Sequence, residues 1–134
     1  MKTVFIVDDE VYIRRSLSEL INWNDLGFET PLLFSNANDA LNAIESNPPF
    51  LIISDIKMPL MDGLDFAKTV YIKNNTINFF ILSAYGEFGL AVKAIRYNVK
   101  RYFVKPISIT ELTSAILDLT EQRNSISKTE YLSD

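Results

Sequence analysis

The sequence predicts an α/β fold, a doubly wound sheet of five parallel strands with helices on both faces. Short apolar runs rich in β-branched and aromatic residues recur along the chain without clear alternation, which is typical of strands buried on both faces. The stretches between these runs place apolar residues three and four positions apart, the spacing of one-sided helices. Because the two kinds of segment alternate and crossovers between parallel strands are right-handed, we expect the sheet to be parallel.

Five runs are the candidate strands, and the second of them is the weakest. This second run contains Pro31, which has no amide hydrogen to donate to a ladder, so we expect it at an edge of the sheet. The five runs are Val4–Val7, Thr30–Phe34, Phe50–Ser54, Phe79–Leu82 and Tyr102–Val104.

Each candidate strand is followed by a stretch in which four apolar side chains share one helical face. Ser108 and Glu111 have the spacing of a capping box, which predicts the start of the last helix. Residues 1–122 are expected to form one domain, and residues 123–134, where the periodicity is lost, a tail or the start of a linker. The five sets are Ile13, Leu17, Leu20 and Ile21; Ala37, Ala40, Leu41 and Ile44; Leu60, Leu64, Ala67 and Tyr71; Phe88, Ala91, Val92 and Ile95; and Leu112, Ala115, Ile116 and Leu119.

Length, charge and composition narrow the possible functions. The 134 residues suit one domain, and the net charge of −4 leaves no basic excess with which to bind nucleic acid directly. No run approaches the ~20 apolar residues of a membrane span, and without cysteine no oxidising compartment is required. We therefore expect a cytoplasmic protein without membrane contact. The absence of histidine excludes Ser-His and Cys-His nucleophile pairs and histidine-ligated zinc.

Acidic residues follow two of the predicted strands at the point where each strand ends. Asp8, Asp9 and Glu10 come after the first strand, and Asp55 comes after the third. Sites in an open parallel sheet form beyond these carboxyl ends, so neighbouring strands would bring the carboxylates together. Clustered carboxylates repel one another unless they are protonated or bind a cation, and hard oxygen ligands favour Mg²⁺. Glu10 is expected to be a helix N-terminal acid rather than a ligand.

A hydroxyl and an amine follow the remaining strand ends, at Ser83 and Lys105. Mg²⁺ held by carboxylates usually meets a phosphate, whose other oxygens these two groups could bind. An aspartate can itself accept a phosphoryl group, and this transfer needs mainly positioning and charge neutralisation. Asp55 is therefore the candidate phosphoryl acceptor.

Simpler readings of the same residues exist. Asp8 and Asp9 could be acids that a helix dipole favours, and Asp55 could be a turn residue before Met58-Pro59. Lys105 could be an ordinary solvated lysine. Gly63 is expected to permit a tight turn before a helix. The metal reading is preferred because it accounts for the acids, the hydroxyl and the lysine together.

Four motifs, each after a predicted strand, resemble the receiver domain of two-component response regulators. They are VDDE at 7–10, DIKMPLMDG at 55–63, LSAY at 82–85 and YFVKP at 102–106. The resemblance covers about residues 2–122 and implies a flavodoxin-like (βα)5 fold with strand order 2-1-3-4-5. The long segment INWNDLGFE, which begins at Ile21, further resembles receivers joined to an AraC-type helix-turn-helix output domain.

The resemblance also implies roles for the residues in these motifs. Asp55 would take a phosphoryl group from the phosphohistidine of a partner kinase, and Ser83 and Lys105 would bind its oxygens. The ligands of Mg²⁺ would be Asp8, Asp9, Asp55 and the backbone carbonyl of Lys57.

A switch is implied as well. Ser83 would move toward the phosphoryl group, and the ring of Tyr102 would turn inward into the space that this movement opens. The face formed by the fourth helix, fifth strand and fifth helix would change and could form a homodimer. Ala84 would leave room beside the acceptor, and Tyr85 would hinder the water that hydrolyses the aspartyl phosphate.

The sequence therefore predicts a signalling domain that phosphorylation controls, with self-phosphorylation and self-dephosphorylation as its only catalysis. DNA would be reached only through an output domain. A phosphorylation-independent receiver-like module is the main alternative. A phosphatase with an aspartyl nucleophile is disfavoured because Lys57 stands where a second acid is usual. A flavodoxin-like cofactor binder is disfavoured because Asp8, Asp9 and Glu10 would repel phosphate.

Overall fold

The protein folds around one parallel sheet of five strands, as the sequence predicts, in the order β2-β1-β3-β4-β5 that the family resemblance implies. The computed structural model describes residues 1–84, 89 and 95–132. Pro31 directly precedes the edge strand β2, which is shorter than expected. The strands are β1 (Val4–Val7), β2 (Leu32–Phe34), β3 (Leu51–Asp55), β4 (Asn78–Ser83) and β5 (Val99–Val104).

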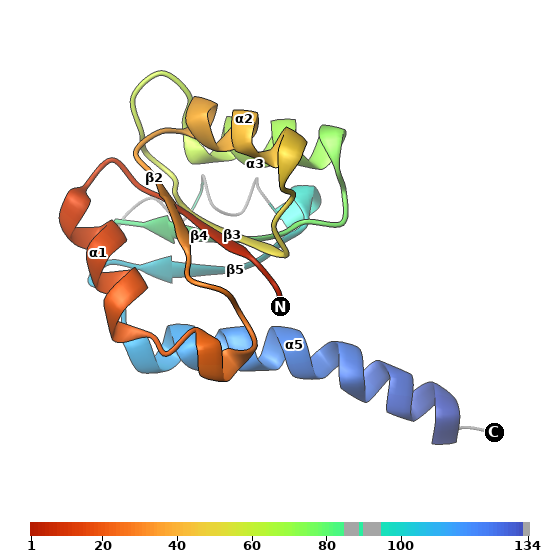
Figure 1. Cartoon of the computed structure of the whole chain (residues 1–134). Helices are drawn as coiled ribbons and strands as arrows, with labels where there is room; N and C mark the ends of the chain where they lie inside the picture. The colour runs from red at the N-terminus through yellow and green to blue at the C-terminus, as the bar shows by residue number, and fades with distance from the viewer. Residues whose placement is uncertain (85–88, 90–94, 133–134) are drawn as a thin grey trace.

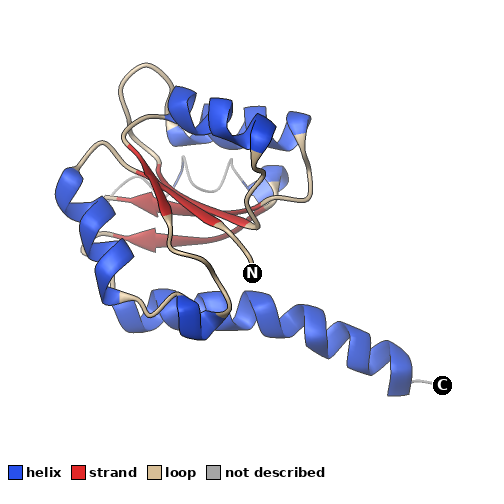
Figure 2. Cartoon of the chain, in the orientation of Figure 1, coloured by secondary structure: helices blue, strands red, loops and turns tan. Residues whose placement is uncertain are grey.

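Helices cover both faces of the sheet. α2 and α3 lie on one face, and α1 and α5 lie on the other (Figures 1 and 2). The expected helix around residues 88–95 falls mostly outside the described residues. No helix in the described part of the chain is long and apolar enough to cross a membrane. The helices are α1 (Val11–Leu20), α2 (Ala37–Ser46), α3 (Gly63–Lys73) and α5 (Ile109–Leu132), with short 3-10 turns at Asn24–Leu26 and Ile95–Tyr97.

The strands supply both halves of the core because their side chains alternate between the two faces. In β1, Phe5 and Val7 pack with α2 and α3, whereas Val4 and Ile6 pack with α1 and α5. Every residue of β1, β3 and β4 is buried. This explains why these strands read as continuous apolar runs in the sequence.

Two leucines that were expected on buried helical faces, Leu60 and Leu20, are exposed. Leu60 lies outside α3, with a φ of 72° and 94% of its surface exposed. The helix begins at Gly63 because the Asp62 side chain caps it, accepting a hydrogen bond of 2.8 Å from the amide of Asp65. Leu20 is 64% exposed at the end of α1, so this leucine does not join the buried face as expected.

The last helix continues farther than its apolar periodicity. Among the α5 side chains that the structure describes, the buried ones are Leu112, Ala115, Ile116 and Leu119. The helical backbone continues to Leu132 and projects away from the body (Figure 1). The loss of apolar periodicity therefore does not mark the end of the helix. The division of the chain at residue 122 remains a prediction.

Asn98, the residue before β5, forms hydrogen bonds to the segment that precedes β4. Its φ is 64°, and its side-chain amide donates to the carbonyl of Ile77 at 2.8 Å and to that of Asn75 at 3.3 Å. Replacing Asn98 with alanine should lower the free energy of unfolding by about 1–3 kcal/mol, since both the hydrogen bonds and tolerance of this φ are lost. Urea unfolding measures this. Glycine tolerates this φ but cannot make the side-chain hydrogen bonds. The free energy of unfolding of Asn98→Gly should therefore lie between those of Asn98→Ala and the parent.

Candidate functional site

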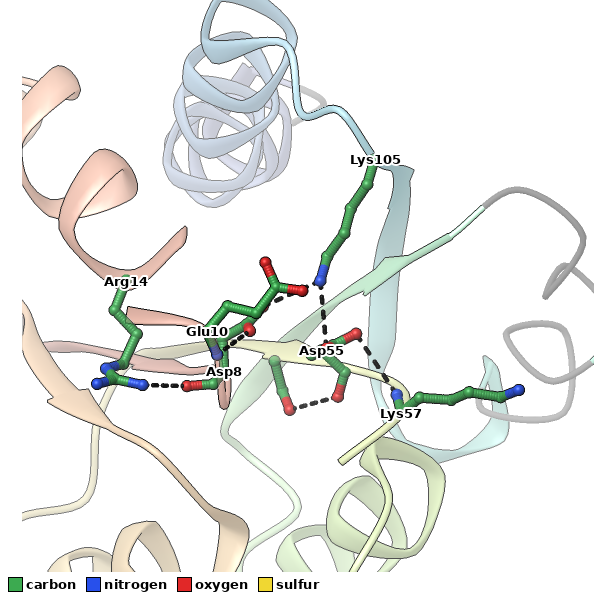
Figure 3. Close-up of polar contacts among 7 residues, drawn as sticks. Asp8, Glu10, Arg14, Asp55, Lys57 and Lys105 are labelled. Atoms are coloured by element: carbon green, nitrogen blue, oxygen red, sulfur yellow. Dashed lines mark hydrogen bonds and ion pairs between the residues drawn. The ribbon is translucent and has the colours of Figure 1, made fainter. Parts of the chain in front are cut away.

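The predicted acidic residues and lysine meet at the carboxyl edge of the sheet. Asp8 follows β1, Asp55 ends β3, and Lys105 follows β5 (Figure 3). Asp8 and Asp55 are buried, with 0% and 6% of their surfaces exposed. The parallel pairings of β1 with β3, of β3 with β4 and of β4 with β5 bring these chain-distant residues to one edge of the sheet.

Lys105 joins the two buried carboxylates. Its Nζ lies 3.3 Å from Asp8 Oδ2 and 3.2 Å from Asp55 Oδ2. The amide of Lys105 donates to the carbonyl of Ser83 at 2.8 Å, which fixes the start of the lysine relative to β4. The reading of Lys105 as a solvated surface lysine is therefore wrong.

Asp8, Asp9 and Asp55 each bring one carboxylate oxygen to within 4.8 Å of the others. Two ligands on opposite sides of Mg²⁺ are about 4.2 Å apart, and Mg²⁺ usually keeps several waters. The three carboxylates therefore fit direct or water-mediated binding of this ion. Glu10 lies outside this group. It is the N-cap residue of α1, although its side chain makes no capping hydrogen bond.

The pKa values show that burial disfavours the charged forms of Asp8 and Asp55. The pKa of Asp8 is raised to about 6, chiefly by burial and also by the charge of Asp55, although the amide of Glu10 and the ammonium of Lys105 oppose this. Burial likewise raises the pKa of Asp55, more than Lys105 lowers it. Burial alone would lower the pKa of Lys105, but Asp8 and Asp55 together outweigh burial and raise it. A bound cation would offset the cost of the buried carboxylates.

Asp8 is held on several sides. Its Oδ1 accepts a hydrogen bond of 2.9 Å from the amide of Glu10, and its own amide donates to the carbonyl of Phe34 at 3.1 Å. The Asp8 carbonyl accepts a hydrogen bond of 2.7 Å from Nη1 of Arg14. Sequence reasoning missed Arg14. The available signal was a cation one turn into the helix that follows the acids.

Gly63 lies directly against the backbone of Asp55. A Cβ at position 63 would be 2.7 Å from the Cα of Ile56 and closer still to the carbonyl oxygen of Asp55. The Gly63 amide also donates to the carbonyl of Ile56 at 2.7 Å. The expectation that Gly63 serves turn flexibility is wrong, since its φ is not positive and close packing is what requires glycine.

Lys57 contacts the acceptor through its backbone. Its amide lies 3.4 Å from Asp55 Oδ1, and its side chain points away from the acidic cluster (Figure 3). Ser54 adds a hydrogen bond of 2.9 Å from its Oγ to the carbonyl of Asp55. The role of the Lys57 carbonyl as a metal ligand remains a prediction.

The predicted switch residues lie on the two neighbouring strands. Ser83 ends β4, and its buried Oγ has no hydrogen-bond partner within the described part of the chain. Tyr102 on β5 is 39% exposed, and Ala84 is exposed after β4. Tyr85 lies outside the described residues. The inward rotation of Tyr102 remains a prediction.

Comparison with known proteins gives the family. A profile of the response regulator receiver domain matches residues 4–117. The transcriptional regulatory protein YesN of Bacillus subtilis is 34% identical over 98% of this chain and 37% of its own length. The transcriptional regulatory protein HptR of Staphylococcus aureus N315 is 34% identical over 84% of this chain and 44% of its own length. The chain thus spans less than half the length of these relatives.

Solved structures give the same result. The receiver domain of AraT, a response regulator from Geobacillus stearothermophilus, superposes with a TM-score of 0.82 at 29% identity, over 92% of this chain and 98% of that one. A two-component transcriptional regulator AraC from Clostridium phytofermentans gives 0.83 at 26% identity, over 90% of this chain and 94% of that one. The chain belongs to the family of response regulator receiver domains.

Proposed function

We propose that this receiver domain is a Mg²⁺-dependent phosphoryl acceptor whose acceptor residue is Asp55. The observation that carries the proposal is the pairing of Lys105 Nζ with two buried carboxylates, at 3.3 and 3.2 Å, with Asp9 beside them. Burial makes the charged forms of Asp8 and Asp55 unfavourable, and carboxylates perturbed in this way cluster at functional sites. The phosphoryl donor is the phosphohistidine of a sensor kinase in the cytoplasm.

The carboxylates of Asp8, Asp9 and Asp55, with the Lys57 carbonyl, would hold Mg²⁺, which supplies charge neutralisation for the phosphoryl oxygens. A carboxylate oxygen of Asp55 attacks phosphorus while the bond from phosphorus to the donor imidazole breaks. Lys105 is already within reach of Asp55 and binds one oxygen of the incoming group. The Oγ of Ser83, buried without a described partner, donates to another. These residues provide positioning and charge compensation, which is what phosphoryl transfer requires.

The response to phosphorylation runs through Ser83 and Tyr102. Movement of Ser83 toward the phosphoryl group lets the half-exposed ring of Tyr102 turn inward, which changes the surface of β5 and α5. With the helix expected around residues 88–95, this surface is the proposed homodimer contact. The relatives are named transcriptional regulators and are longer than this chain. We infer that the output is transcription and that DNA is bound by an output domain rather than by this one.

Intact mass spectrometry after incubation with Mg²⁺ and acetyl phosphate tests the proposal. The parent should gain the mass of one phosphoryl group, and both the Asp55→Asn variant and the parent in EDTA should gain none. Asp65→Asn is the matched control because Asp65 is an exposed acid in the first turn of α3, two residues after the 55–63 motif. It should be phosphorylated like the parent. Phosphorylation of Asp55→Asn, or none in the parent, would contradict the proposal.

A further inference from the structure

Arg14 of α1 holds Asp8 through its backbone carbonyl, whereas the Asp8 carboxylate pairs with Lys105. The Asp8 amide continues the ladder to Phe34 of β2, but β2 ends there, so this ladder does not extend to the Asp8 carbonyl. The carbonyl instead accepts a charge-assisted hydrogen bond of 2.7 Å from Nη1 of Arg14. Arg14 lies on α1, one turn after Glu10, and reaches back over the loop (Figure 3).

We propose that Arg14 is a positioning residue for the Mg²⁺ site, which it serves by fixing the backbone of Asp8. This inference rests on the proposed function. The bond to the carbonyl fixes the peptide that follows Asp8, and that peptide carries Asp9. The next amide, that of Glu10, donates to Asp8 Oδ1 at 2.9 Å. Loss of the Arg14 bond would therefore release both acidic residues, because their relative placement depends on this short loop.

The direction of the expected effect separates positioning from simple charge. Arg14 is a cation near a cluster that binds a cation, so its charge by itself opposes Mg²⁺ binding. If charge were its whole contribution, a neutral residue would tighten binding. If Arg14 positions Asp8 and Asp9, a neutral residue weakens binding, because groups that orient metal ligands typically contribute about tenfold or more to affinity.

The test measures Mg²⁺ affinity by titration calorimetry in the parent and three variants. Arg14→Met keeps the aliphatic stem without donors or charge, and its Mg²⁺ dissociation constant should rise about tenfold. Arg14→Lys restores a charged donor and should bind Mg²⁺ more tightly than Arg14→Met, close to the affinity of the parent. Arg15→Met is the matched control, because Arg15 is the exposed neighbour on α1, and it should bind as the parent does or slightly more tightly.

A second readout needs no metal. In EDTA, the amide hydrogen of Glu10 should exchange faster in Arg14→Met than in the parent, because its acceptor, the Asp8 carboxylate, is no longer fixed.

Three results would each overturn the inference. The first is Mg²⁺ binding by Arg14→Met as tight as in the parent or tighter. The others are a loss of Mg²⁺ affinity in Arg14→Lys, or in Arg15→Met, equal to that in Arg14→Met. If the parent binds Mg²⁺ but accepts no phosphoryl group, the proposed function fails while the role of Arg14 stands. If the parent binds no Mg²⁺, both fail.

Discussion

Replacing Gly63 with alanine is expected to destabilise the domain by about 3 kcal/mol and to impair phosphorylation of Asp55. The added Cβ would be 2.7 Å from the Cα of Ile56 and closer to the Asp55 carbonyl, and neither backbone atom can rotate aside. β3 and the start of α3 would have to separate. Because Asp55 is the last residue of β3, the acceptor would move with them. Urea unfolding and intact mass after acetyl phosphate treatment measure the two effects.

Gly27→Ala provides the comparison for Gly63→Ala. A Cβ at Gly27 would meet nothing within 4 Å, but φ there is 88°, which costs an alanine about 1 kcal/mol. The free energy of unfolding of Gly27→Ala should fall by only this smaller amount, and the variant should accept a phosphoryl group as the parent does. A Gly63→Ala variant as stable as the parent would show that β3 and α3 can separate freely, contrary to the packing.

Replacing Asp8 with asparagine is expected to stabilise the metal-free protein while removing its response to Mg²⁺. The pKa of Asp8 is about 6 in the folded protein against an ordinary value of 3.8. A carboxyl group with a raised pKa stabilises the fold when protonated, and this contribution is lost as pH rises from about 4 through 6. At about pH 7.5 the charged Asp8 therefore costs up to about 3 kcal/mol. The substitution also removes one ion-pair partner of Lys105, which offsets part of this amount. We therefore expect the free energy of unfolding to rise by about 1–2 kcal/mol in Asp8→Asn.

The pH profile identifies the cause of this gain. In EDTA, the free energy of unfolding in urea should be clearly higher for Asp8→Asn than for the parent at about pH 7.5. Near pH 4 the two values should be almost equal. Added Mg²⁺ should raise the melting temperature of the parent but not of the variant, since a ligand stabilises only the state that binds it. Asp9→Asn is the control: Asp9 is exposed, so this variant should lose the Mg²⁺ response without the gain in stability. A metal-free Asp8→Asn less stable than the parent at the higher pH would contradict the account.

The sequence was sufficient for the sheet and for most of the site, for a physical reason. Strands buried on both faces, such as β1 and β3, appear in the sequence as continuous apolar runs. The acidic residues at the ends of these runs are therefore easily recognised. Asp8 and Asp55 meet because β1 pairs with β3, a neighbour relation that the family resemblance implied and the residue pattern alone left open. The predicted convergence of Asp8, Asp9, Asp55 and Lys105 is confirmed.

Other features depend on contacts that periodicity does not encode. Leu60 has the spacing of a helical residue, but the cap at Asp62 decides where α3 begins. Gly63 is required by a close approach between two backbones, and Arg14 acts by reaching back to a carbonyl six residues earlier. Each of these is a single contact in three dimensions, and only the folded chain shows it.

The length of α5 has a mechanical consequence. The helix continues for 13 residues beyond Leu119, to Leu132, and projects from the body (Figure 1), which gives an arm of about 20 Å at the helical rise per residue. A stiff arm magnifies motion at its base, so a tilt of about 10° where α5 rests on the sheet would carry its tip by about 3 Å. A rearrangement of β5 too small to alter the sheet would thus become, at Leu132, a displacement comparable to the width of a side chain.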